Sequence, residues 1–584
     1  MALAPVTLDD KYALDAGRVF LTGTQALVRL PMMQRRRDEA AGLNTGCYIS
    51  GYRGSPLGLV DQQLWQARSF LDKHHIKFQP GVNEDLAATA ILGTQQLDMS
   101  PGARYDGIFS MWYAKGPGVD RSGDILRHGN LFGSHPKGGV LLLAGDDHTC
   151  KSSTTAHQTE YAFMDAMIPV LNPAGVQEFL DLGLYGWAMS RYSGCWSAFK
   201  LIAETVDSSA SVYVDPHRVD IKLPEDFEMP EGGLSIRYPD TPLEMEERLH
   251  RYKTHAVLAF ARANKLDKAI IDGPNRRFGI VTCGKSYLDV RQALEELGIN
   301  EDYARAIGLS IYKVGMTWPL EREGIRQFCE GLEEVLVVEE KRPVIENQLK
   351  EQLYNWRADQ RPGVIGKYDE SGEWILPSIG ELTPSQIARV IAKRLGKFHS
   401  SSQIDDRIKF LESREHALQS NSESFQRTPY FCSGCPHNSS TKVPAGSRAL
   451  SGIGCHFMAQ WMERNTETFT HMGAEGVPWL GISPFTDEEH VFANIGDGTY
   501  YHSGMMAIRQ AIAANVNMTY KILFNDAVAM TGGQPHDGPL TVPRITQQVM
   551  AEGASSVVVV TDEPDKYPRD AGFASGTKVF HRDD

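Results

Sequence analysis

Short apolar runs that end close to a glycine alternate along this chain with stretches of helical periodicity. Three examples are the run GGVLLLAGDD from Gly138, the segment RFGIVTCGKSYLDVRQALEELGI from Arg277, and the segment EVLVVEEKRPVIENQLKEQL from Glu334. Continuous apolar runs of this length indicate buried strands, and apolar residues three or four positions apart indicate helices. Their alternation is typical of parallel α/β units, so the pattern predicts an α/β fold with parallel sheets.

Two polar helical stretches interrupt this alternation and predict three consecutive parallel-sheet α/β domains. One lies near residues 242–268, and the other, rich in Ser, Gln and charged residues, lies near residues 400–426. Polar segments between periodic blocks are typical of connections. We therefore expect domains at residues 1–235, 276–400 and 427–584, with a helical connection at residues 236–275 and a linker at residues 401–426.

Length, charge and cysteine content narrow the class of protein. A chain of 584 residues is long enough for three or four domains of roughly 100 to 200 residues each. The formal net charge is -14 and no long basic run is present, which argues against nucleic acid as a partner. Asp9 and Asp10 interrupt the place of a signal peptide, no apolar run has the length of a membrane span, and the cysteines are too sparse for a disulfide scaffold. We therefore expect a cytoplasmic protein.

The stretch VFANIGDGTYYHSG, which begins at Val491, joins an apolar run to Gly-Asp-Gly and a helical segment. A second apolar run ends at Asn525, so that 26 residues separate the second glycine from this asparagine. Across a β-α-β crossover, Asp497 and Asn525 would lie side by side at the carboxyl ends of two parallel strands. Their oxygens suit an octahedral Mg²⁺ that also binds a diphosphate. A tight strand-to-helix turn is the alternative interpretation of Gly-Asp-Gly taken alone.

The spacing of Gly-Asp-Gly and Asn525 matches the diphosphate-binding motif of thiamine diphosphate enzymes. With the AMTGGQP segment that follows, the chain from Gly434 to its end resembles the thiamine-binding domain of 2-oxoacid:ferredoxin oxidoreductases, particularly the indolepyruvate ferredoxin oxidoreductase group. The resemblance extends over nearly the whole chain in three blocks and implies thiamine diphosphate and Mg²⁺ as cofactors. The metal ligands that it implies are Asp497, Asn525 and the carbonyl of Ala527, and the further cofactor contacts are Gly496, Gly498, Thr531 and Gln534.

A thiamine enzyme also needs a carboxylate beside the aminopyrimidine ring, which supports the change of tautomer of that ring. Glu84, in the segment QPGVNEDLAATAILGTQQL, resembles the glutamate that opens a small-residue helix in the family's pyrimidine-binding domain. The resemblance therefore implies that Glu84 is catalytic. The alternative is an acidic residue favoured by the amino terminus of a helix.

Substrate contacts are less specific in the sequence. Ser55 lies in a Gly/Pro turn where the family has a Thr or Ser that faces the 2-oxoacid, Arg121 is a candidate contact for a substrate carboxylate or coenzyme, and His148 follows a strand end that is expected near the substrate pocket. A turn-capping serine, a surface arginine and a solvated turn are the respective alternatives. The middle domain of the family usually carries no chemistry, and Cys283 in it is expected to be a small buried residue.

Three cysteines form a candidate metal-binding pattern. Cys432 and Cys435 have two residues between them, and Cys455 follows after 19 more. The spacing suits zinc, completed by His437 or His456, or an iron–sulfur cluster. In the family that the chain resembles, this pattern holds a [4Fe-4S] cluster beside thiamine. No cysteine follows Cys455, so we expect the fourth ligand on a continuation or a partner chain; a substitute ligand or an absent cluster are the alternatives.

The resemblance implies a thiamine diphosphate-dependent oxidative decarboxylation. Its substrate would be a 2-oxoacid, with an arylpyruvate such as indolepyruvate implied by the family, and its products an acyl-CoA and CO₂, with electrons passed through an iron–sulfur cluster to ferredoxin. A non-oxidative thiamine decarboxylase or synthase, and a non-catalytic zinc-binding assembly subunit, are the alternatives. The expected partners are the 2-oxoacid, coenzyme A, ferredoxin, and a further subunit or carboxyl-terminal continuation in a homo-oligomer or hetero-oligomer.

Overall fold

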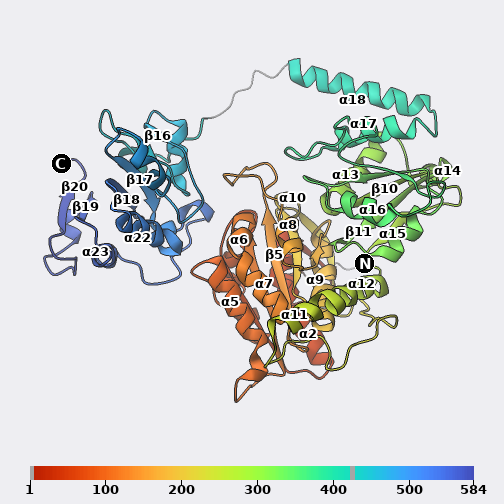
Figure 1. Cartoon of the computed structure of the whole chain (residues 1–584), viewed down its shortest axis with the longest axis horizontal. Coiled ribbons are helices and arrows are strands. Elements are labelled where there is room, and N and C mark those ends of the chain that lie inside the picture. The colour runs from red at the N-terminus through yellow and green to blue at the C-terminus, as the bar shows by residue number, and fades with distance from the viewer. Residues whose placement is uncertain (1–5, 421–427) are drawn as a thin grey trace. The chain divides into compact units, whose positions relative to one another are not determined.

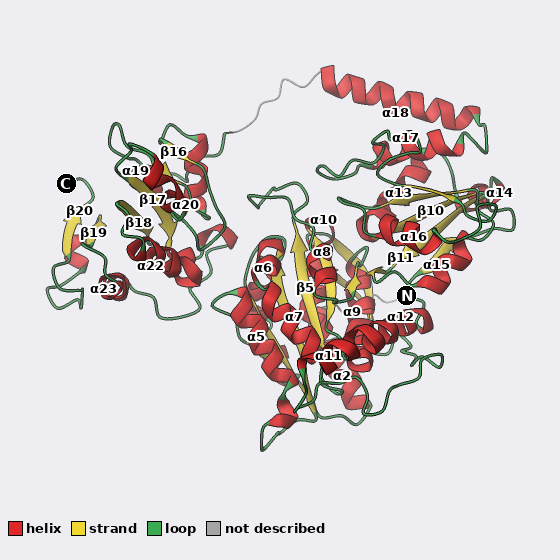
Figure 2. Cartoon of the chain, viewed as in Figure 1, coloured by secondary structure: helices red, strands yellow, loops and turns green. Residues whose placement is uncertain are grey.

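The structure is a computed structural model that describes residues 6–420 and 428–584 (Figure 1). The chain divides into two compact units, Met1–Glu423 and Ser424–Asp584. In both units strands form sheets that helices cover (Figure 2). The prediction of an α/β fold with mostly parallel sheets is therefore confirmed.

A seven-stranded sheet forms the centre of the first unit. Six of its strands are parallel, and one short edge strand, β12 (Met316–Trp318), is antiparallel. The order across the sheet is β12-β6-β7-β5-β4-β2-β3. The six parallel strands are β2 (Thr45–Gly51), β3 (Ile76–Phe78), β4 (Gly107–Lys115), β5 (Val140–Asp146), β6 (Val170–Leu171) and β7 (Ser197–Ile202).

Helices bury both faces of this sheet. The main ones are α2 (Gly23–Ala40), α5 (Glu84–Gln95), α6 (Gly116–Arg121), α7 (Gly123–Phe132), α8 (Glu160–Asp165) and α9 (Val176–Ser193). Successive side chains of a strand point to opposite faces. Accordingly, Leu141 and Leu143 of β5 join one core with α2 and α9, whereas Leu142 and Ala144 join another with α5 and α7. Because both faces are buried, the strand reads as a continuous apolar run.

A five-stranded sheet follows in the same unit, in the order β14-β13-β10-β11-β9. Its edge strand β9 (Lys268–Ile271) is antiparallel, and the other four are parallel. Those four are β10 (Phe278–Cys283), β11 (Leu309–Val314), β13 (Glu334–Val338) and β14 (Gly363–Ile365). The helices that pack around them are α13 (Gly284–Glu296), α14 (Glu301–Ala306), α15 (Arg322–Cys329), α16 (Ile345–Leu353) and α17 (Pro384–Leu395).

Strand β12 connects the two sheets of the first unit. It continues from β11 and pairs with β6, with Met316 opposite Leu171. The Asp267 carboxylate accepts the backbone N–H groups of Gly315 and Met316 at 2.7 and 3.0 Å, which holds the chain where it crosses over. Residues expected in the first and the middle domains therefore share one sheet, which the sequence pattern did not predict.

Helices occupy both polar stretches that were interpreted as connections. In the first, α11 (Pro242–Arg248), a π-helical turn and α12 (Thr254–Ala263) follow one another. Thr241 caps α11 because its hydroxyl accepts the N–H of Glu244, and the Glu244 carboxylate accepts the backbone N–H of Thr241. Pro242 suits the first turn of the helix. The second contains α18 (Ser402–Ser420), and residues 421–426 of the expected linker lie outside the described residues.

The second unit is built on a four-stranded parallel sheet in the order β16-β15-β17-β18. Its strands are β15 (Ala449–Leu450), β16 (Thr466–Glu467), β17 (Val491–Gly496) and β18 (Met518–Leu523), and its longer helices are α22 (Met505–Ala513) and α23 (Val542–Glu552). A separate parallel pair is formed by β19 (Val558–Thr561) and β20 (Lys578–His581).

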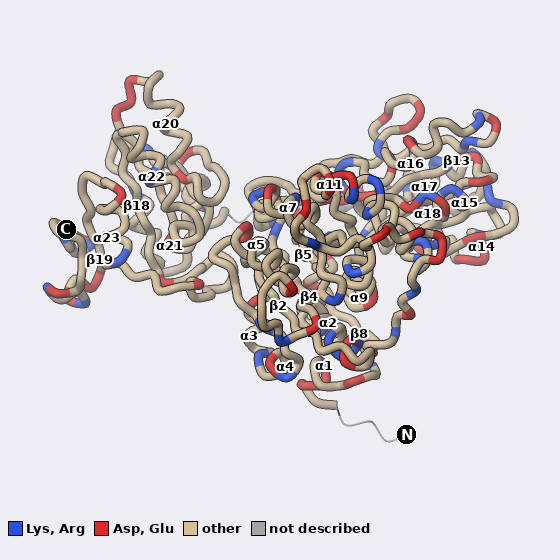
Figure 3. Tube along the Cα trace, turned by 60° about the horizontal axis from the view of Figure 1, so that its bottom comes forward, with Lys and Arg blue, Asp and Glu red and all other residues tan. Residues whose placement is uncertain are grey.

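The charged residues show no segregation by sign, and the helices have no long apolar stretch in the described part of the chain (Figure 3). Acidic and basic positions are intermixed along both units (Figure 3). Within the residues that the structure describes, no helix has the length and apolar character needed to cross a membrane.

Candidate active site

Asp497 lies where β17 and β18 end side by side. The two strands are parallel, with Gly496 opposite Leu523, so the residues that follow them meet at one edge of the sheet. The side chain of Asp497 is 4% exposed, and its Oδ2 accepts the backbone N–H groups of Asn525 and Asp526 at 2.9 and 2.8 Å. Its Oδ1 accepts the N–H of Gly498 at 2.9 Å. One buried carboxylate therefore ties the ends of two neighbouring strands together.

The same carboxylate retains capacity for a cation. A carboxylate has about four lone-pair sites, and the three N–H groups use three of them. Asn525 is exposed, and its side-chain oxygen accepts the N–H of Ala527 at 3.3 Å. Oxygen donors of this kind on adjacent strand ends suit Mg²⁺, which keeps waters and binds one or two protein carboxylates. The donor set of Asp497 and Asn525 thus fits a Mg²⁺-diphosphate ligand.

The segment after Asn525 is a closed loop. Val528 donates its N–H to the carbonyl of Gln534 at 2.8 Å, and the side chains of Thr531 and Gln534 bond to each other at 2.9 Å. Gln534 also donates to the carbonyl of Thr531. Gly533 adopts a φ of 73°, a conformation that glycine allows without strain. The loop therefore places Thr531 and Gln534 next to each other, and their observed bonds fix the shape of the turn.

His536 is a site residue that the sequence did not single out. Its side chain is 3% exposed, its Nε2 lies 3.4 Å from Oδ2 of Asp497, and its Nδ1 lies 3.7 Å from Asp526. The signal available in sequence was only a histidine directly after the AMTGGQP segment. The structure makes it the nearest basic side chain recorded beside Asp497 in the described part of the second unit.

Three buried polar side chains of the second unit have atoms without hydrogen-bond partners. The hydroxyl of Ser451, the side-chain amide of Asn494 and Nε2 of His456 are buried and make no hydrogen bond. The His456 ring lies against Gly496, where an added Cβ would be 3.5 Å from it. Buried polar groups are normally satisfied, so such a set indicates a place for a bound ligand or water. The sequence did not reveal it because the three residues come from separate segments.

The cysteine pattern forms a looser group than the sequence suggested. Burial raises the pKa of the Cys455 thiol, and the nearby thiols of Cys435 and Cys432 raise it further. Cys435 contacts Nδ1 of His437 at 3.2 Å, and the ring of His437 stacks on that of His456 with centroids 6.2 Å apart. Among the described residues, however, no three His, Cys, Asp or Glu side chains lie in a position to share a metal ion. The arrangement therefore forms no site for a single metal ion such as zinc, and the three cysteines as ligands of an iron–sulfur cluster stay a prediction.

Glu84 is the first residue of α5 in the other unit. Asn83 caps this helix, since its side chain accepts the N–H of Leu86 at 3.1 Å. Glu84 is 7% exposed and packs against Gly118, where an added Cβ would lie 2.8 Å from the Glu84 Oε1 atom. Burial lowers the pKa of Lys115, and the Asp147 and Glu84 carboxylates partly offset that shift. Glu84 is thus a buried acidic side chain at the edge where the parallel strands end.

The predicted substrate residues are separated into two places. Arg121 lies beside the Glu84 helix, because its Nε contacts the Asp85 carboxylate at 3.3 Å. Ser55 precedes Pro56, whose ring lies next to Gly145 near the end of β5. His148 instead lines a cavity that includes residues of the middle segment. Cys283 is buried, as expected, and contacts Asn172.

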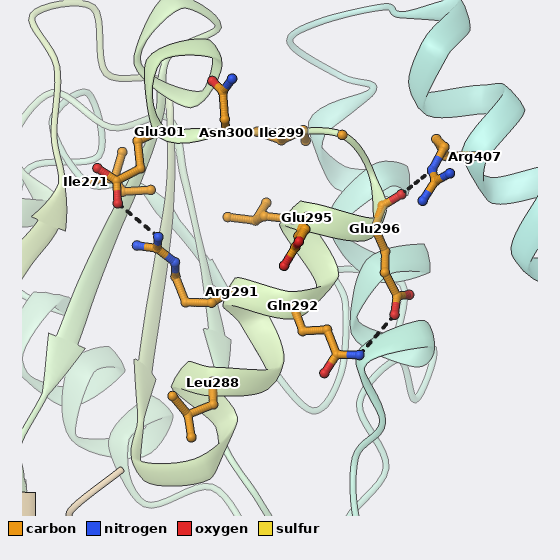
Figure 4. A pocket seen from close by; sticks show the side chains of 12 residues that line it. Ile271, Leu288, Arg291, Gln292, Glu295, Glu296, Ile299, Asn300, Glu301 and Arg407 are labelled. Carbon is orange, nitrogen blue, oxygen red and sulfur yellow. Dashed lines mark hydrogen bonds and ion pairs between the residues drawn. The ribbon is translucent and has the colours of Figure 1, made fainter. Parts of the chain in front are cut away.

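A hollow of about 1000 Å³ lies beside α13 and α18 (Figure 4). Its polar groups are bonded to one another: Arg291 pairs with Glu301 at 2.9 Å, and Gln292 donates to Glu296 at 3.1 Å. The described residues that line it include none of the predicted site residues. It therefore offers no candidate chemistry.

The folds of the two units and the site geometry correspond to matches with known families. Residues 452–566 match the model "Thiamine pyrophosphate enzyme, C-terminal TPP binding domain", which places this part of the chain in the class of thiamine diphosphate-binding domains. Residues 267–421 match the model "Indolepyruvate ferredoxin oxidoreductase middle domain". The second match includes the five-stranded sheet and all of α18.

Individual proteins similar to this chain agree with these matches. It is 27% identical over 579 residues to indolepyruvate oxidoreductase subunit IorA of Pyrococcus abyssi, covering 93% of this chain and 81% of that protein. The IorA subunit of Methanothermobacter marburgensis is 25% identical over 556 residues, covering 91% and 79%. The chain is thus similar to IorA subunits over most of its length, and the resemblance indicated by its motifs is confirmed.

Among solved structures, a 2-oxoglutarate:ferredoxin oxidoreductase from Magnetococcus marinus matches 65% of this chain and 65% of its own, with a TM-score of 0.46 and 15% identity.

Proposed function

We propose that this chain is the thiamine diphosphate-binding subunit of an oxidoreductase that oxidatively decarboxylates an arylpyruvate such as indolepyruvate. The observation that carries the proposal is the Asp497 carboxylate, which joins two strand ends and retains capacity for a cation beside Asn525. The similarity to proteins named indolepyruvate oxidoreductase subunits supports the choice of substrate. The acceptor of the acyl group is proposed to be coenzyme A.

The diphosphate end of the cofactor is assigned to the second unit. Asp497, the side chain of Asn525 and the carbonyl of Ala527 would hold Mg²⁺, and Gly496 and Gly498 keep that corner free of side chains. Thr531 and Gln534 shape the loop that follows. When bound, thiamine diphosphate supplies the carbanion chemistry that decarboxylation of a 2-oxoacid requires.

Glu84 is assigned to the aminopyrimidine. A buried carboxylate that forms a hydrogen bond to a ring nitrogen favours the tautomer in which the exocyclic nitrogen can accept a proton. The Glu84 side chain is buried against Gly118, which fixes its position, and Lys115 adds a positive charge nearby. Arg121, held by Asp85, and Ser55 are the residues proposed to face the substrate.

The overall reaction must release two electrons. A 2-oxoacid anion and a thiol become a thioester and CO₂, and two electrons and one proton leave. We assign the electrons to a one-electron carrier of the ferredoxin type. Cys432, Cys435 and Cys455 form no single-ion site in the described residues, and their role as ligands of an iron–sulfur cluster on the electron path stays a proposal.

Comparison of substrates tests the proposed function. The purified chain, together with its partner subunit, is supplied with thiamine diphosphate, Mg²⁺, coenzyme A and a viologen dye, and dye reduction is followed without oxygen. We expect kcat/KM for indolepyruvate and phenylpyruvate to exceed the values for pyruvate and 2-oxoglutarate by at least about tenfold, the factor that small pocket differences provide. Equal values for all four acids would contradict the assignment of an arylpyruvate substrate.

A further inference from the structure

A cavity of about 550 Å³ opens in the first unit between the loop after β5 and the segment after β13. Its volume lies in the range of pockets that hold small organic ligands. The residues that line it come from both halves of the unit: His148, Thr149, Cys150, Ala156, His157, Gln158, Lys341, Arg342, Ser378, Ile379 and Gly380.

The lining is positively charged although the chain as a whole is acidic. Lys341 and Arg342 line the cavity, and no carboxylate is among the described residues that do so. The nearby acidic groups are engaged elsewhere. Asp147 accepts the backbone N–H groups of Lys151 and Ser152 at 3.0 and 2.7 Å, and Glu381 contacts the Lys151 ammonium at 3.4 Å. The local electrostatics therefore favour an anion.

His148 provides the second observation that points to a ligand. Its side chain is buried, with the residue 4% exposed, and neither ring nitrogen has a hydrogen-bond partner. Burial lowers the pKa of His148 well below its usual range, and neighbouring lysines, first Lys200 and Lys341, lower it further. A neutral imidazole has one N–H to donate and one nitrogen to accept. Buried polar groups are normally satisfied, so a buried ring beside the cavity with both positions unused indicates a place for a bound ligand or water.

Lys341 is held in place by the same loop. Its ammonium donates to the carbonyl of His148 at 2.7 Å and to that of Gly380 at 3.3 Å, which uses two of its three hydrogens. Lys341 and Cys150 both adopt a φ of 57°, which is uncommon for residues other than glycine. Two strained backbone positions in the wall of one cavity indicate that the surrounding structure enforces its shape.

The short helix α6 lies between the cavity and Glu84. An added Cβ on Gly116 would lie 2.6 Å from Nδ1 of His157, a wall residue, and one on Gly118 would meet Glu84. Between these positions and the cavity, Lys115 donates to the carbonyl of Ser152 at 2.5 Å. A ligand in the cavity would therefore be separated from the proposed catalytic carboxylate by little more than α6.

We propose that this cavity binds the anionic group, carboxylate or phosphate, of a small organic ligand, with Lys341 and His148 as its contacts. The ammonium offers its remaining hydrogen and the imidazole offers its N–H, as anionic oxygens require. The middle segment would then contribute to ligand binding, contrary to the expectation that it carries no chemistry. A carboxylate source is the 2-oxoacid of the proposed function; a phosphate source is a phosphorylated second substrate.

Alkylation of Cys150 reports directly on occupancy of the cavity. Cys150 is exposed and lines the cavity, whereas Cys432, also exposed, lies in the other unit and serves as an internal control. The full chain without thiamine diphosphate is treated with iodoacetamide at constant ionic strength, and both sites are followed by peptide mass spectrometry. The probes are inorganic phosphate, pyrophosphate and phenylpyruvate, with chloride as the salt control.

We expect a probe at about ten times its Kd to slow alkylation of Cys150 about tenfold and to leave Cys432 unchanged. Protection by phosphate or pyrophosphate alone identifies a phosphate-bearing ligand, and protection by phenylpyruvate alone identifies the substrate carboxylate, a result that rests on the proposed function. Absence of protection by all three, or equal protection by chloride, would overturn the proposal. The assay contains no thiamine diphosphate, so that failure would leave the proposed function untouched.

Two variants connect protection to the named contacts. His148→Leu removes a ring that makes no hydrogen bond, so it should fold, and Lys341→Met removes the cation. Each should raise the probe concentration needed for half-protection about tenfold. Lys222→Met removes a lysine of the same unit that lies outside the cavity lining and whose side chain is 66% exposed, and it should have no effect. Wild-type protection in His148→Leu would overturn the role of the imidazole whether or not Lys341→Met folds.

Discussion

Replacement of Asp497 by asparagine removes one negative charge and keeps the shape of the side chain. In the structure its carboxylate accepts three backbone N–H groups, from Gly498, Asn525 and Asp526. An asparagine has one acceptor oxygen and an NH₂ group. The Asp497→Asn variant therefore loses its attraction for a cation and leaves at least one of these N–H groups facing another donor.

The structure sets the size of both effects. Hydrogen bonds to charged groups contribute about 1.5 to 3 kcal/mol, and loss of an anionic ligand is of similar size. Since 1.4 kcal/mol corresponds to a factor of ten, we expect Mg²⁺-dependent affinity for thiamine diphosphate to fall by roughly 10- to 100-fold. An unsatisfied buried N–H also costs about 1 to 3 kcal/mol, so the second unit should lose unfolding free energy of this order.

Titration calorimetry at fixed, subsaturating Mg²⁺ measures the change in affinity. The matched control is Asp526→Asn, the same substitution in the same turn at a side chain that is 76% exposed. Asp526 has a φ of 59°, which asparagine tolerates, so this variant should bind as the wild type does. Circular dichroism confirms folding of each variant. Wild-type affinity in folded Asp497→Asn would refute the magnesium assignment and reduce Gly-Asp-Gly to a structural turn.

The remaining predictions concern Glu84, its neighbour and one buried acid. Glu84→Gln should lower turnover by about 10² to 10⁴ with little change in thiamine diphosphate affinity, measured by dye reduction and calorimetry; normal turnover would remove Glu84 from the site. Gly118→Ala places a Cβ 2.6 Å from the Glu84 side chain and should lower turnover at least about tenfold, whereas Gly123→Ala enters open space and should not; equal rates in both would refute this packing argument. Burial raises the pKa of Glu475 from 4.5 to about 7. A raised pKa stabilises the fold only while the group is protonated, so the unfolding free energy should fall by on the order of 3 kcal/mol between pH 4.5 and 7. The variant Glu475→Gln, measured by urea titration, should flatten this dependence on pH. An unchanged slope in the variant would contradict the prediction.

The sequence predicted the strands whose side chains are buried on both faces of a sheet. Both faces of β5, β10 and β13 are covered by helices, so these strands appear in the sequence as continuous apolar runs. The convergence of Asp497 and Asn525 followed from the β-α-β crossover alone, because parallel neighbours end at the same edge. The motif and its spacing therefore predicted this part of the site.

Other features depend on contacts between distant segments. Strand β12 has three residues and carries no periodicity, so its pairing with β6 could not be predicted. Lys341 bonds to the carbonyl of His148 across 193 positions, and no local pattern connects the two. His456 and Asn494 also come from separate segments of the chain, and only folding brings these segments together. In each case tertiary packing, and not local sequence, brings the residues together.

The most direct test of the central claim is the ratio of electrons to CO₂ released. The chain and the proposed partner subunit are incubated without oxygen with labelled indolepyruvate, thiamine diphosphate, Mg²⁺, coenzyme A and a viologen acceptor, and CO₂ and reduced dye are counted together. An oxidative decarboxylation predicts two electrons for each CO₂, with a thioester as the organic product. Release of CO₂ with an aldehyde and no reduced dye would contradict the account and identify a non-oxidative thiamine decarboxylase.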